Sequence, residues 1–256
     1  MNKLYEKLVN LNLKRSGWLF FATVVLLLII GANSLASFLG GYIYYLFYQG
    51  IYGIILSILL PVFFVFFIER EGLKELGIRK ITIRPVLVAA LFIAFSIGGQ
   101  LYKKGAVITS ADYLIMISIP LVMTTFFEEF LFRGFFQMRF EKLFGAVPAV
   151  LLSGLMFSLY HLGYPKFRSW DSLLTLFLVG VMFALSFKLS GNSLFTAYFV
   201  NLPNAILTYL YNPQNFPDFN LCTAVVSAAV ILLLILFFVL APGRLKQAEQ
   251  RISKAV

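Results

Sequence analysis

The chain has 256 residues, of which 61% are hydrophobic and only 12% are charged, and its net charge is +10. Soluble domains are nearer half apolar and about one quarter charged, so this composition excludes an ordinary soluble enzyme and a disordered chain. The single cysteine excludes an internal disulfide, and the single histidine, His161, excludes zinc sites built on two or three histidines. A mean hydropathy of +0.90 instead predicts an integral membrane protein of single-domain length.

Eight apolar stretches are long enough to cross the hydrocarbon core as helices, which takes about 20 residues. Their continuous apolar runs do not alternate as the strands of a membrane β-barrel do. We therefore predict an all-α helical bundle that forms a single domain over residues 1–256, with its motifs between 113 and 211. The eight predicted spans are Trp18–Phe38, Gly50–Ile68, Pro85–Tyr102, Tyr113–Met138, Ala146–His161, Ser172–Leu189, Ser193–Tyr211 and Leu221–Ala241.

The distribution of basic residues supports this span count. Lysine and arginine concentrate in cytoplasmic loops, because they resist translocation and are attracted to the anionic inner leaflet. With the N-terminus inside, 16 of the 21 basic residues fall in cytoplasmic segments, four fall in outside loops, and Arg133 lies within a span. The bias predicts that both termini are cytoplasmic, and it explains the net positive charge without a nucleic-acid partner.

Ionisable side chains deep within a span are costly and therefore indicate function or pairing. Glu128, Glu129 and Arg133 lie in the fourth predicted span, and His161 ends the fifth. At about 100° per residue, Glu129 and Arg133 lie about 40° apart, which is the spacing of an ion pair, whereas Glu128 lies about 140° from Arg133. One arginine cannot neutralise two carboxylates, so Glu128 is the candidate general base. The alternative is that all three residues only lock helices together.

The seventh predicted span carries a third polar position, formed by Asn201, Pro203 and Asn204. A proline within a span frees a backbone carbonyl, which a wet cavity or a neighbouring helix must satisfy. The pattern is therefore compatible with a polar site and also with a kinked packing motif. At about 1.5 Å of rise per residue, Asn201 can meet Glu128 and His161 at one depth.

The pattern Glu128-Glu129-xxx-Arg133, followed in the next span by Phe157-xxx-His161, resembles the motifs of the CPBP family of intramembrane glutamic proteases. That family includes CAAX prenyl endopeptidases of the Rce1 type and bacteriocin-immunity (Abi) proteins. The resemblance covers most of the chain. It implies that Glu128 activates water, that His161 positions this water, and that Glu129 and Arg133 form a supporting pair.

The chain departs from the family in its last motif, a histidine followed four residues later by Asn or Asp. Asn201 stands in the histidine position, and Ala205 stands in the second position, with Asn204 one residue short of it. An asparagine amide can donate a hydrogen bond to a developing oxyanion, but it cannot carry a proton. Either Asn201 acts as that donor, or the protein has lost hydrolysis and kept the scaffold.

The favoured hypothesis is a glutamate-dependent endopeptidase of a prokaryotic cytoplasmic membrane, acting on membrane-embedded or lipidated peptide or protein substrates. It needs no cofactor and no metal. The alternative is a non-catalytic CPBP-type scaffold or self-immunity protein that binds a membrane partner. A proton-coupled transporter would show broken helices in matching halves, and apart from Pro203 the sequence shows none.

Overall fold

The structure is a computed structural model that describes residues 15–212, 225, 227–233 and 236. These residues contain helices and no strand, which confirms the all-α class. Within this part of the chain, six helices are long and apolar enough to cross a membrane, and they match the first six predicted spans: Arg15–Leu39, Ile43–Ile68, Ile83–Lys104, Ala111–Phe144, Ala146–Gly163 and Trp170–Leu189.

The seventh and eighth predicted spans have different outcomes. The seventh coincides with helix α10 (Leu194–Tyr211), although this helix is not among the six apolar candidates. The eighth, at 221–241, lies largely outside the described residues. The count of eight and the cytoplasmic location of both termini therefore stay predictions.

Several spans are assembled from consecutive helical segments of different pitch. The segments η1, η2 and η4 are π-helical, and η3, η5 and η6 are short 3₁₀ helices. In chain order the elements are α2 (Arg15–Leu39), α3 (Gly41–Tyr45), η1 (Leu46–Leu59), α4 (Leu60–Phe63), η2 (Phe64–Ile68), η3 (Leu73–Leu76), α5 (Ile83–Lys104), α6 (Ala111–Glu129), η4 (Phe130–Gln137), α7 (Met138–Phe144), α8 (Ala146–Tyr160), η5 (His161–Gly163), η6 (Pro165–Phe167), α9 (Trp170–Leu189) and α10.

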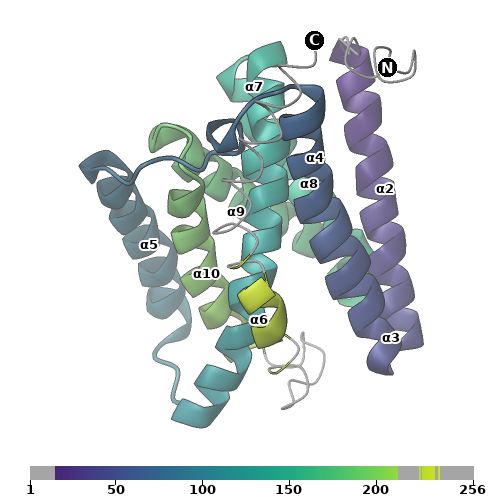
Figure 1. The fold of residues 1–256 in the computed structure, drawn as a ribbon. Helices are drawn as coiled ribbons and strands as arrows, with labels where there is room; N and C mark the ends of the chain where they lie inside the picture. Colours follow the sequence, from purple (N-terminus) through teal and green to yellow (C-terminus); the bar gives the residue numbers. More distant parts are fainter. Residues whose placement is uncertain (1–14, 213–224, 226, 234–235, 237–256) are drawn as a thin grey trace.

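The continuous helix α6–η4–α7 runs through the middle of the bundle, with α10 and then α5 on one side and α2 on the other (Figure 1). It begins at an N-cap where the Ser110 hydroxyl accepts a hydrogen bond from the Tyr113 amide at 3.2 Å. In its most apolar window 61% of the residues are buried in the protein, against 11% for α5. Side chains on the central helix are therefore shielded from lipid, whereas α5 presents most of its surface outward.

Helices α8 and α9 cross at two glycines. A Cβ atom at Gly180 would lie 2.9 Å from the carbonyl oxygen of Gly154, which is closer than real Cβ contacts come. Small residues at such a crossing let two backbones approach, as is common between membrane helices. The crossing matters for the site because it brings the backbone of α9 within reach of the central helix.

A polar network holds the loop before α5 against one end of the central helix. Arg139 forms an ion pair with Glu69 and donates to the carbonyl of Glu75 at 2.8 Å. The Lys142 ammonium lies 2.6 Å from Glu75 and holds the pKa of that carboxyl below its usual value. The helix continues past Met138, the predicted end of the fourth span, to Phe144, and the charged residues of this extension are paired.

Candidate active site

The two glutamates lie where the central helix changes pitch. Glu129 is the last residue of α6, and the π-helical segment η4 begins at Phe130. Wider π-helical turns are rare and occur frequently at functional sites. Glu129 and Arg133 are fully buried, whereas Glu128 keeps 7% of its surface exposed. Of these three residues, only Glu128 has any exposed surface.

Arg133 is enclosed by one carboxylate, one backbone carbonyl and two aromatic rings. Its Nη1 atom lies 3.2 Å from Oε1 of Glu129, so the ion pair expected from the spacing is present. Its Nη2 donates to the carbonyl of Gly180 at 2.8 Å, which the close helix crossing makes possible. Its guanidinium carbon also lies 4.7 Å from the ring centre of Phe157 and 5.5 Å from that of Phe183. These contacts match the cation–π geometry that stabilises a desolvated arginine.

Glu128 is held by neutral donors. The Tyr160 hydroxyl donates to its Oε1 atom, and the Asn201 amide donates to its Oε2 atom at 2.8 Å. The same amide nitrogen donates to Oε1 of Glu129, also at 2.8 Å. The structure therefore brings Asn201 to both carboxylates, and it gives Glu128 hydrogen bonds that stabilise a carboxylate without neutralising its charge.

His161 follows Tyr160 directly, in the 3₁₀ turn η5. Its Nδ1 atom lies 2.8 Å from the carbonyl oxygen of Phe157, and its ring centre lies 4.0 Å from that of Tyr160. A carbonyl oxygen can only accept, so Nδ1 carries the hydrogen, and Nε2 of the neutral ring is an acceptor. No hydrogen bond joins His161 to Glu128 among the described residues. The two are linked through the ring of Tyr160.

Asn204 has partners other than the glutamates. Its Oδ1 atom accepts from Ser96 at 2.6 Å and from Gln100 at 2.7 Å, both on α5. The structure directs Asn201 to α6, whereas Asn204, three residues further along the same helix, is directed to α5. Pro203 lies within α10 and does not end it. Asn204 therefore belongs to the seam between α5 and α10.

Tyr160 is the site residue that sequence reasoning missed. A tyrosine in an apolar helix is indistinguishable from a packing residue when only the sequence is read. Its position next to the single histidine, one helix away from the glutamates, was the available signal. Among the described residues, no group of three or more His, Cys, Asp and Glu side chains is placed to hold a metal ion.

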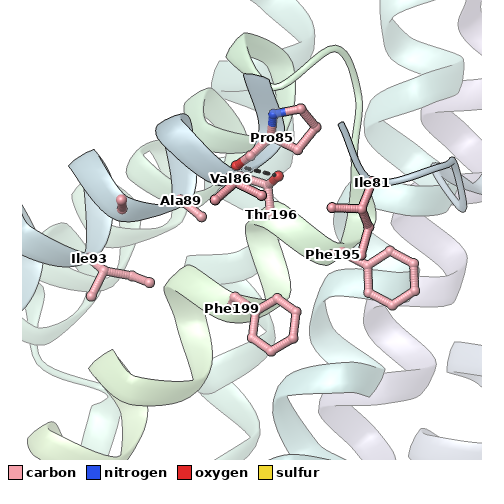
Figure 2. A pocket seen from close by; sticks show the side chains of 9 residues that line it. Ile81, Pro85, Val86, Ala89, Ile93, Phe195, Thr196 and Phe199 are labelled. Carbon is pink, nitrogen blue, oxygen red and sulfur yellow. Dashed lines mark hydrogen bonds between the residues drawn. The ribbon is translucent and has the colours of Figure 1, made fainter. Parts of the chain in front are cut away.

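An apolar groove of about 370 Å³ lies between α5 and α10 (Figure 2). Thr196 and Phe199 of α10 face it, while Asn201 on the same helix faces the glutamates. The Thr196 hydroxyl donates to the carbonyl of Pro85 at 3.3 Å, which ties the two helices together beside the groove. The lining residues are Ile81, Pro85, Val86, Ala89, Ala90, Ile93, Phe195, Thr196 and Phe199.

Comparison with known proteins supports the family resemblance. Residues 110–206 match the family model described as type II CAAX prenyl endopeptidase Rce1-like. This segment contains both glutamates, Arg133, His161 and Asn201. No match was found among curated proteins or among solved structures. Residues 110–206 are therefore similar to an Rce1-like domain, which is consistent with the CPBP family.

Proposed function

We propose that the protein is an intramembrane endopeptidase in which Glu128 activates water. The observation that carries the proposal is the asymmetry of the acidic pair. Glu129 is fully buried against Arg133, whereas Glu128 is slightly exposed and bound only by neutral donors. A carboxylate that is buried but not neutralised is suited to accept a proton during a reaction.

The proposed reaction needs one water between Glu128 and His161. The Nε2 atom of His161 accepts one hydrogen of this water, and Glu128 removes the other proton as the oxygen attacks the substrate carbonyl carbon. Asn201 then donates to the oxyanion, since its bond to Glu128 weakens once that carboxylate is protonated. The proton on Glu128 passes to the leaving nitrogen as the C–N bond breaks, and the products are a carboxylic acid and an amine, between which a proton then passes to give a carboxylate and an ammonium group.

The proposed substrates are membrane-embedded or lipidated peptides and proteins. The name of the matched family indicates prenylated CAAX peptides as one such class. The groove supports the broader class, since its apolar walls suit a lipid chain or an apolar peptide segment. Helix α10 carries both a wall of the groove and, on another side, Asn201. We place this activity in a prokaryotic cytoplasmic membrane.

A second candidate function is a non-catalytic scaffold or self-immunity protein that binds a membrane partner. The two bonds from Asn201 favour it, because they occupy both amide hydrogens with carboxylates and lock α10 to α6. In that case the buried charges hold the bundle together, and no group is left to stabilise an oxyanion.

The test uses purified protein in proteoliposomes with a panel of membrane-anchored peptides, in water enriched in ¹⁸O. The proposal predicts new peptide C-termini that carry ¹⁸O, present with the wild type and absent with Glu128→Gln. Glu71→Gln is the matched control, because Glu71 is exposed in the loop before α5. Absence of cleavage by the wild type, together with a partner that co-purifies with wild type and Glu128→Gln alike, would favour the scaffold.

A further inference from the structure

Tyr160 is the side chain through which the acidic pair and the histidine are connected. It is 2% exposed, it ends α8, and its hydroxyl donates to Oε1 of Glu128. Asn201 holds the other oxygen of the same carboxylate. The two donors therefore approach Glu128 from different helices and fix the plane of its carboxylate.

The Tyr160 ring is itself fixed on three sides. It stacks on Tyr52, with ring centres 5.6 Å apart at 24°, and lies 5.2 Å from the ring of Phe132 at 31°. On its third side lies the His161 ring, 4.0 Å away between centres. A ring packed in this way has little freedom to turn, so the direction of its O–H group is set before any substrate binds.

We propose that Tyr160 is a positioning residue for Glu128, one that fixes the direction in which this carboxylate receives a proton from water. The proposal rests on the proposed function, in which Glu128 is the base. Of the two side chains that donate to Glu128 in the described residues, Asn201 is an amide and Tyr160 is the one hydroxyl. Tyr160 is therefore the hydroxyl donor to the Glu128 carboxylate, in a chain that has only one histidine.

Tyr160→Phe removes the hydroxyl and keeps the ring. A hydrogen bond to a charged group corresponds to about a 10- to 100-fold change in rate, so kcat falls by this factor while KM stays unchanged. The acid limb of the pH–rate profile also moves to higher pH, since the ionised carboxylate has lost a donor that stabilised it. A merely structural tyrosine would not move this limb.

The matched control is Tyr48→Phe. Tyr48 is buried in the same aromatic cluster, and its hydroxyl donates to Thr124 at 2.9 Å, one helical turn before Glu128. Its removal is expected to leave kcat and the pH profile unchanged. If Tyr48→Phe and Tyr160→Phe slow the reaction equally, or if Tyr160→Phe leaves both kcat and the acid limb in place, the proposal is overturned.

A spectroscopic measurement separates this proposal from the proposed function. The infrared carboxylate band of Glu128 is identified by its loss in Glu128→Gln, and the wild type is then compared with Tyr160→Phe. The proposal predicts that this band shifts in Tyr160→Phe and not in Tyr48→Phe. An unshifted band overturns the positioning role whether or not cleavage is observed, whereas a shifted band without any cleavage contradicts the proposed function alone.

Discussion

Removal of Arg133 tests how the buried charges are divided between the two glutamates. At an effective dielectric constant of about 20, unit charges separated by the observed 3.2 Å attract by about 5 kcal/mol. Deleting one partner of a buried pair typically costs about 3–5 kcal/mol, because the other charge stays buried without compensation. We therefore expect Arg133→Met to lower the free energy of unfolding by about 4 kcal/mol.

The assay is equilibrium unfolding in mixed detergent micelles, extended to two double variants. Glu129→Gln should restore much of the stability lost in Arg133→Met, because it removes the carboxylate that the arginine neutralises. Glu128→Gln should restore less, since its oxygens are bound by Tyr160 and Asn201 and not by the arginine. The coupling energy with Glu129 is expected to exceed that with Glu128 by at least about 1 kcal/mol. Equal couplings, or an Arg133→Met variant as stable as the wild type, would refute this division of charge.

Three further predictions concern the crossing, the groove and the loop network. Gly180→Val should lower the free energy of unfolding by about 1–3 kcal/mol, because the new side chain overlaps the backbone of α8. Gly98→Ala should leave it unchanged, because a Cβ atom there meets no atom within 4 Å, and equal stability of the two variants would contradict the close crossing. Ala89→Trp should fill the groove and raise KM for membrane-anchored peptides at unchanged kcat, and a fall in kcat alone would argue against a substrate-binding groove. The pKa of Glu75 is lower in the folded protein than its unfolded value of 4.5, so the ionised carboxylate stabilises the fold above pH 4.5, and this stabilisation is lost as the pH falls through the lowered pKa. The free energy of unfolding of the wild type should therefore exceed that of Glu75→Gln by less than about 1 kcal/mol near pH 6 and should equal it in strong acid. A difference that does not depend on pH would exclude the ion pair with Lys142 as its source.

Local geometry explains which parts of the site could be predicted. The contact between Glu129 and Arg133 depends on positions four residues apart in one helix, and the structure has it at 3.2 Å. The meeting of Asn201 with Glu128 also agrees with the depth predicted for these two residues, whereas His161, predicted at the same depth, has no hydrogen bond to Glu128 in the described part of the chain. Helical periodicity and rise were sufficient for both.

Tertiary partners explain what could not be predicted. Asn204 is directed to α5 by Ser96 and Gln100, and nothing in the sequence of α10 specifies which neighbour lies on that side. The contact of Tyr160 with Glu128 could not be predicted either, because it depends on how α8 packs against α6. The continuation of the helix of the fourth span past Met138 to Phe144, where Arg139 and Lys142 are paired with the loop before α5, was likewise not visible in the sequence.

The central claim is that Glu128 is the base that activates water. Its most direct test is the rate of ¹⁸O incorporation into cleaved membrane-anchored peptide by Glu128→Gln, relative to the wild type, for protein shown to unfold at the same midpoint. General-base catalysis contributes about 10²- to 10⁴-fold, so the account predicts a loss of at least about 100-fold. Incorporation by Glu128→Gln at the wild-type rate would contradict it.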